Sequence, residues 1–204
     1  MTIHLHKGDL PENVDLGATV AIDTETLGLN PHRDRLCLVQ LSGGDGHAHL
    51  VQIAKGQSEA PRLAALLADP GVLKLFHFAR FDVAVLGHAF NVPVTPVYCT
   101  KIGSRLTRTY TDRHGLKDLC RELLGVDISK QQQSSDWAAD TLTDAQLEYA
   151  ASDVLYLHAL KEKIDGLLDR DGRMALAEAC FEFLPTRAAL DLAGWAETDI
   201  FAHS

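Results

Sequence analysis

The chain has 204 residues, of which 46% are hydrophobic and 23% are charged, as in folded globular proteins with a full core. This composition excludes a disordered or fibrous protein, and every apolar run is far shorter than the ~20 residues of a membrane-spanning helix. Acidic residues outnumber basic ones by 28 to 19, and the net charge of −9 disfavours non-specific adhesion to long nucleic acid. A polyanionic substrate therefore needs a local source of positive charge, such as a bound divalent metal ion.

The cysteines and the chain ends indicate the compartment. The four cysteines are spread out without a C-x-x-C pair, which argues against a disulfide framework and against a zinc ribbon. The segment Met1–Asp9 lacks the basic region and apolar run of a secretory signal, and residues 202–204 carry no lipidation or retention motif. We therefore expect a cytoplasmic protein without membrane association.

The first predicted elements are strands. A β-branched run at residues 18–23 predicts a buried strand. Runs at 36–42 and 47–53 flank a glycine-rich turn at 43–46, a pattern typical of two antiparallel strands. The three strands together predict a meander.

Helices and strands then alternate. The pattern predicts a helix after Pro61, a strand at 72–76, a helix at 79–90 and a strand at 97–100, followed by helix to near the end. The expected fold class is α/β, with a mixed sheet of an antiparallel meander plus parallel strands, flanked by helices. Since the sequence has no linker and no solenoid repeat, we expect a single domain over 1–204 with a helical C-terminal extension from about residue 172.

Two acids lie at the end of the first predicted strand. Asp23 and Glu25 are two residues apart, so alternation along a strand sends both carboxylates to the same side. Carboxylates that are brought together need a partner, and Mg²⁺ and Mn²⁺ prefer carboxylate oxygens as ligands. A D-x-E tripeptide is common, and a solvated strand end is the alternative interpretation.

Two further acidic signals follow along the chain. Asp82 lies in the first turn of the helix predicted at 79–90, where the helix dipole favours an anion. Tyr149 and Asp153 are four residues apart, so a helix projects the phenol and the carboxylate from one face. Each signal alone also fits an ordinary first-turn acid or an amphipathic face.

In this order and context, the three motifs resemble those of the DEDD superfamily of 3′ to 5′ exonucleases, in the branch with a tyrosine in the third motif. Asp23 and Glu25 match the first motif, Phe81–Asp82 the second, and Tyr149 with Asp153 the third. The resemblance to ribonuclease D covers about residues 18–165 and includes the stretches 115–119, 123–125, 130–137 and 146–153. The chain has no room for the helical nucleic-acid-binding domains of ribonuclease D, and in length it is similar to the stand-alone nanoRNase C enzymes.

This resemblance implies a ribonuclease H-like fold and a 3′ to 5′ exoribonuclease that releases nucleoside 5′-monophosphates. Four carboxylates would hold two divalent metal ions, Mg²⁺ or Mn²⁺, for an in-line displacement: Asp23, Glu25, Asp82 and Asp153. Tyr149 would position the attacking water, since a phenol with a pKa near 10 is a poor base in bulk solvent. The resemblance also implies short oligoribonucleotides, down to dinucleotides, as substrates, and a ring-shaped, octamer-like homo-oligomer.

Five residues are candidate substrate contacts. Leu29 follows the first strand and would wedge between terminal bases, or it packs as an ordinary loop residue. Lys130 and Gln133 match a polar segment that approaches substrate in ribonuclease D, or they lie in a solvated loop. His77 lies near the site or is satisfied in the core, and Thr24 lies between the two acids of the first motif.

His47 and His49 are the other candidate metal ligands. Alternation puts both imidazoles on one side of the strand predicted at 47–53. No third or fourth ligand follows at the spacing of a metal site, so we do not predict a metal site there.

Two rival functions stay open. One is a DNA-directed or proofreading 3′ to 5′ exonuclease, because recognition of the 2′-hydroxyl has no readable sequence signature. The other is an inactive exonuclease-like module that binds nucleic acid. The intact set of four carboxylates and Tyr149 argues against the second.

Overall fold

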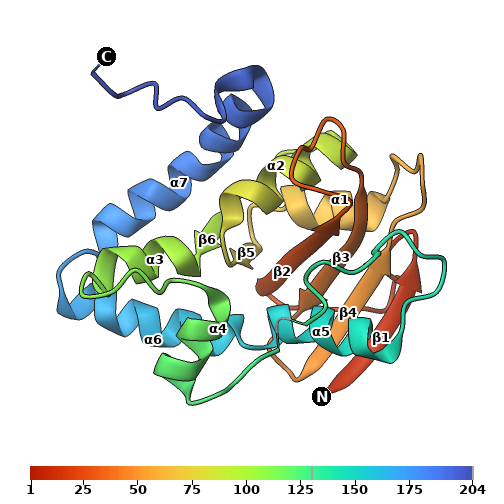
Figure 1. Cartoon of the computed structure of the whole chain (residues 1–204), viewed down its shortest axis with the longest axis horizontal. Coiled ribbons are helices and arrows are strands. Elements are labelled where there is room, and N and C mark those ends of the chain that lie inside the picture. The colour runs from red at the N-terminus through yellow and green to blue at the C-terminus, as the bar shows by residue number, and fades with distance from the viewer. Residues whose placement is uncertain (130, 204) are drawn as a thin grey trace.

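The fold is built on one six-stranded mixed sheet (Figure 1). The computed structural model describes residues 1–129 and 131–203, so Lys130, one of the candidate phosphate contacts, lies outside the described residues. The sheet has the strand order β1-β4-β3-β2-β5-β6, with β2, β3 and β4 antiparallel and the other pairs parallel. The strands are β1 (Thr2–Lys7), β2 (Thr19–Thr26), β3 (Leu36–Ser42), β4 (His47–Gln52), β5 (Leu73–Phe76) and β6 (Val97–Cys99).

The predicted fold class is confirmed, with one strand added. The meander of β2, β3 and β4 forms as its three strand-like runs and glycine-rich turn predict. The additional strand is β1, which lies at the edge of the sheet, parallel to β4 and in the register Ile3↔Ala48 and Leu5↔Leu50. Its apolar residues alternate with histidines, and its partner follows about forty residues later, so no hairpin signal marks it.

Helices account for most of the rest of the chain. The described helices are α1 (Pro61–Ala68), α2 (Ala79–Phe90), α3 (Thr100–Thr107), α4 (Leu116–Leu119), η1 (Cys120–Leu124), α5 (Asp144–Leu155), α6 (Leu157–Arg170), α7 (Met174–Leu190) and η2 (Asp191–Trp195). The expectation of helix throughout the second half is wrong for the described residues between η1 and α5, which form turns and irregular chain. Gly125 ends η1 with a positive φ of 70°, and the polar tract that follows offers no apolar face to pack. None of the described helices is long and apolar enough to cross a bilayer.

Helix α5 is held against the sheet by its own apolar cluster. In Figure 1 α5 lies across the strands β3 and β4. A capping box between Thr143 and Gln146 fixes where the helix begins. The cluster includes Ala150 of the helix itself and consists of Cys37, Leu38, Leu50, Trp137, Leu142 and Ala150. This packing fixes the position of the face of α5 that carries the third motif.

Candidate active site

The carboxylates of the first and third motifs meet over the sheet. Asp23 and Glu25 extend from β2, and Asp153 extends from α5. Each offers an oxygen atom, and these three atoms lie within 4.8 Å of one another. Side-chain alternation on the strand and the packing of α5 thus bring together three acids that are up to 130 positions apart in the sequence.

The acid of the second motif approaches the same site from α2. Asp82 is only 3% exposed, and its Oδ1 accepts a 2.7 Å hydrogen bond from the hydroxyl of Thr24. Its negative charge is close enough to contribute to raising the pKa of Glu25. Helix α2 begins after Phe78, which adopts a left-handed conformation with φ of 73°. That sharp turn directly off β5 aims the first turn of α2 at the end of β2.

Tyr149 lies beside Asp153, as their spacing on one helix predicts. The carboxylate of Asp153 is close enough to its hydroxyl to act on it electrostatically. Burial is the main cause that raises the pKa of Tyr149, and the negative charges of Asp153, Glu25 and Asp23 raise it further. The phenol therefore stays protonated at neutral pH, which suits it to orient a water molecule and not to act as a base.

The acids are strongly perturbed by their surroundings. Burial raises the pKa of Asp23 to about 7. Burial, followed by the charges of Asp23, Asp153 and Asp82, raises the pKa of Glu25 to about 10. Bringing carboxylates this close favours protonated forms unless a cation neutralises them. The donor set, all carboxylate oxygen, is the chemistry that Mg²⁺ and Mn²⁺ prefer, so the residues fit divalent metal ions.

Gln40 is a residue of this site that the sequence pattern did not reveal. It lies on β3 directly opposite Asp23, and its Nε2 donates a 3.3 Å hydrogen bond to Oδ2 of Asp23. Its Oε1 is buried without a hydrogen-bond partner among the described residues. The available signal in the sequence was a glutamine within the strand predicted at 36–42, and the structure shows that this glutamine is fully buried. Which residue of the neighbouring strand it faces depends on the strand register.

The loop that follows β2 carries Leu29. The Leu29 side chain is 84% exposed, so it is free to meet a ligand. The loop is closed by Asp34, whose Oδ2 accepts a 3.0 Å hydrogen bond from the backbone of Asn30 and whose carboxylate pairs with Arg33. A Cβ on Gly28 would lie 2.3 Å from Oδ2 of Asp34, so a larger residue here would displace the carboxylate that closes the loop.

The other candidate contacts lie in different settings. The side chain of Thr24 is 7% exposed and is engaged with Asp82, which makes it a support for a candidate ligand. His77 is half-buried, and its Nδ1 is 2.9 Å from the hydroxyl of Thr100. Gln133 is exposed in the turn after residue 130. Substrate contact by these residues stays a prediction.

The C-terminal segment is fastened to the elements that carry the site. Asp191 accepts hydrogen bonds of 2.5 and 2.7 Å from Arg80, which lies two residues before Asp82, and one of 2.6 Å from Arg187. His32, in the loop of Leu29, is 2.9 Å from the carbonyl oxygen of Leu192. The segment at η2 thus braces both α2 and the loop after β2.

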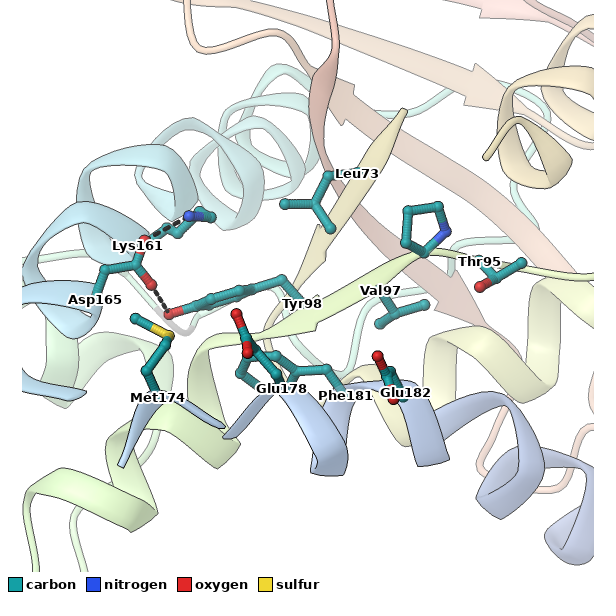
Figure 2. A pocket seen from close by; sticks show the side chains of 11 residues that line it. Leu73, Thr95, Val97, Tyr98, Lys161, Asp165, Met174, Glu178, Phe181 and Glu182 are labelled. Atoms are coloured by element: carbon teal, nitrogen blue, oxygen red, sulfur yellow. Dashed lines mark hydrogen bonds and ion pairs between the residues drawn. The ribbon is translucent and has the colours of Figure 1, made fainter. Parts of the chain in front are cut away.

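A separate cavity lies between β6, α6 and α7 (Figure 2) and has a volume of about 480 Å³. Tyr98 donates a 2.9 Å hydrogen bond to Asp165, which also pairs with Lys161, and Glu178 and Phe181 come from α7. None of the five predicted catalytic residues lines this cavity. This cavity and the acidic site are therefore different places.

The chain is similar to known proteins in sequence and in fold. A family described as 3′-5′ exonuclease matches residues 9–169. Ribonuclease D of Gluconacetobacter diazotrophicus is 36% identical over 155 residues, which are 76% of this chain and 39% of that protein. DNA polymerase I of Aquifex aeolicus is 34% identical over 168 residues, 82% of this chain and 26% of that protein. The chain thus spans about two fifths of the ribonuclease D relative and a quarter of the polymerase.

Solved structures match over the whole length. Brucella melitensis NrnC with bound Mg²⁺ is 64% identical with a TM-score of 0.96, and NrnC bound to pGG is 65% identical with a TM-score of 0.97. Both comparisons cover 100% of each chain. The match therefore includes α7 and η2, which the family match does not reach. The chain belongs to the 3′-5′ exonuclease family, with similarity to ribonuclease D over about three quarters of its length and to NrnC throughout.

Proposed function

We propose that the protein is a metal-dependent 3′ to 5′ exoribonuclease that hydrolyses short oligoribonucleotides, down to dinucleotides, to nucleoside 5′-monophosphates. The observation that carries this proposal is the convergence of Asp23, Glu25 and Asp153 within 4.8 Å, with Tyr149 one turn before Asp153 on α5. Asp82 completes the set from α2. No covalent nucleophile is needed, because water attacks the phosphodiester directly.

Two divalent ions, Mg²⁺ or Mn²⁺, are the proposed cofactors, held by Asp23, Glu25, Asp82 and Asp153. When bound, they supply positive charge that neutralises phosphate and makes water a better nucleophile. The carboxylates fix where that charge lies, and Gln40 and Thr24 hold two of them in place through hydrogen bonds. Tyr149 orients the attacking water through a hydroxyl that stays protonated.

The proposed preference for short RNA rests on charge. The net charge of −9 offers no general attraction for a long strand. Binding energy must then come from the substrate end, with Leu29 as a wedge against terminal bases and Lys130, Gln133, His77 and Thr24 as the proposed polar contacts. NrnC bound to pGG, 65% identical to this chain, supports the same substrate class.

We further propose a cytoplasmic homo-oligomer in a ring-shaped, octamer-like arrangement. The described C-terminal residues expose large apolar groups, among them Phe183, Trp195, Ile200 and Phe201, which a second copy would cover. All four cysteines are free, as expected in a reducing compartment. Light scattering that finds a monomer at micromolar concentration would remove the oligomer from the proposal.

Degradation resolved by chain length tests the function. RNA dinucleotides and RNAs of about 20 nucleotides, labelled at the 5′ end, are incubated with Mn²⁺ or Mg²⁺, with and without EDTA. We expect stepwise loss from the 3′ end, abolished by EDTA, and a higher kcat/KM for the dinucleotide. A higher kcat/KM for the long RNA would contradict the substrate class, and the Asp153→Asn protein serves as the control for contaminating nuclease.

A DNA-directed exonuclease is the second candidate, favoured by the 34% identity to DNA polymerase I of Aquifex aeolicus. Matched DNA dimers and DNAs of the same lengths in that assay decide between the two. Faster hydrolysis of DNA would replace the RNA assignment. No hydrolysis of either would indicate a binding module.

A further inference from the structure

Four histidines form a column on the sheet edge, on the strands β1 and β4. His4 faces His49 in the strand register, so His4 and His6 lie on the same face as His47 and His49. Nε2 of His4 is 2.9 Å from Nδ1 of His47, and Nε2 of His6 is 3.0 Å from Nδ1 of His49. The rings of His4 and His49, one from each pair, are stacked on each other with centroids 4.7 Å apart. His47 and His49 have no further candidate ligands at the spacing of a metal site later in the sequence. Their partners, His4 and His6, come from earlier in the sequence, in β1.

This column has no part in the nuclease chemistry. The strands β1 and β4 carry none of the catalytic carboxylates. The four imidazoles are partly buried, and Asp45, in the turn before β4, is the charged group that acts on His49. Burial and then the charge of His4 lower the pKa of His6, and burial and then His4 and His6 lower that of His49. These shifts favour the neutral rings of His6 and His49.

We propose that this histidine column is a second metal site, which takes a borderline transition-metal ion such as Cu²⁺ or Ni²⁺ between the facing nitrogens of each histidine pair. Imidazole nitrogen is a preferred ligand of these ions. The proton that a pair shares moves to the outer nitrogen of its ring by a tautomer change, which leaves both facing nitrogens with lone pairs for the ion.

The separation of the nitrogens favours particular ions. Metal–nitrogen bonds of about 2.0–2.1 Å put two ligands about 2.9 Å apart at a right angle and about 3.4 Å apart at a tetrahedral angle. The observed separations of 2.9 and 3.0 Å match the right angle, which is the angle of square-planar and octahedral sites. Cu²⁺ and Ni²⁺ adopt these geometries, whereas Zn²⁺ prefers the tetrahedron. A modest turn of each ring toward the ion completes the chelate.

The site is a pair of two-nitrogen chelates and not one four-histidine cage. Among the described residues, the group that brings three ligand atoms within 4.8 Å is the acidic one, Asp23, Glu25 and Asp153. Water must therefore fill the other positions on each ion, so the affinity is that of an open, reversible site. The two sites of the protein also differ in ligand, because the column offers nitrogen and the carboxylates offer oxygen. Mg²⁺ accordingly does not compete for the column.

Electron paramagnetic resonance of added Cu²⁺ tests the proposal, because nitrogen and oxygen ligands give different hyperfine patterns. The spectra are recorded with the full chain in excess Mg²⁺, which occupies the carboxylates. We expect nitrogen couplings from two ions per chain, one for each hydrogen-bonded pair. His47→Gln and His6→Gln each remove one pair while keeping a hydrogen-bonding side chain, so each should lose one ion, and the double variant both.

His88→Gln is the matched control. His88 contacts His32 with ring centroids 4.9 Å apart, but the rings meet edge to face at 75°, and this contact is not a hydrogen bond between ring nitrogens. This variant should keep both nitrogen-ligated ions. Absence of nitrogen coupling in the wild type, or its persistence in the folded double variant, would overturn the proposal. Nuclease activity with Mg²⁺ should be the same in all variants, so this test stands apart from that of the proposed function.

Discussion

The pKa of an aspartate carboxyl is shifted in opposite directions in two regions of the protein. One region is the acidic site, and the other is the arginine network of Arg80, Arg187 and Asp191 at the C-terminal segment. At the site, Asp23 lies among other carboxylates, and burial raises its pKa to about 7. In the network, burial also acts on Asp191, but hydrogen bonds from Arg80 and Arg187 outweigh it and lower the pKa of that carboxyl. In the network, Arg80 and Arg187 supply the positive charge that Asp191 needs. The carboxylates of the acidic site need cations from solution instead. This difference separates a group that braces the fold from the groups that we propose as metal ligands.

The two regions are also physically joined. Arg80 connects Asp191 to the start of α2, where Asp82 lies, and its Nη2 donates a 2.6 Å hydrogen bond to the carbonyl of Ala196. The site therefore relies on a segment outside the part of the chain that the exonuclease family match covers. Changes in the two regions should act differently, on chemistry in one and on stability and geometry in the other.

The largest effect is expected from removing a metal ligand. Asp153→Asn should reduce hydrolysis to background, because in-line attack depends on the bound cations. The same change relieves repulsion among the acids, so the melting temperature of the metal-free protein should stay the same or rise. Product formation and thermal melting in EDTA measure both effects. Wild-type-like turnover by the purified variant would refute the metal assignment.

Tyr149→Phe should lower the chemical rate by roughly 10²-fold, the low end of effects from groups that handle protons. The change deletes only the hydroxyl and keeps the ring against Trp137, so substrate affinity and stability should change little. Single-turnover kinetics and substrate binding separate rate from affinity. An affinity loss as large as the rate loss would make Tyr149 a substrate clamp.

Asp191→Asn should destabilise the protein by about 1–3 kcal/mol, because Arg80 and Arg187 lose their counter-charge while Asp191 is largely buried. Turnover should fall by less than in Tyr149→Phe, since Asp82 is displaced and not removed. Asp171→Asn is the matched control, because its partner Arg170 is 64% exposed and such pairs contribute little. Equal melting temperatures for both variants would argue against a brace at η2.

The smallest effect is on the pH dependence of the metal-free protein. The folded-state pKa of Asp23, about 7, lies above its ordinary value of 3.8, so the folded state binds more protons between these values. Stability in EDTA should therefore fall as pH rises from about 4 to about 7. Metal binding displaces these protons, so Mn²⁺ should raise the melting temperature more at pH 8 than at pH 6. An equal shift at both pH values would contradict this.

Sequence alone determined what depends on local periodicity. The strand β3 and the helix α2 form over the residues that the pattern predicts, 36–42 and 79–90. The spacing of Asp23 and Glu25 on a strand, and of Tyr149 and Asp153 on a helix, also put each pair on one face before any tertiary contact is known. These features follow from repeats of 2 and 3.6 residues, which any short segment carries in itself.

Only the tertiary structure decided which distant segments meet. Gln40 reaches Asp23 across 17 positions, His4 reaches His47 across 43, and Arg80 reaches Asp191 across 111. The first two contacts depend on strand register, and a shift of one residue would turn each side chain to the other face. The third depends on how α7 and η2 return to α2. Such contacts depend on how the whole chain packs, so they cannot be predicted from a short segment of the sequence.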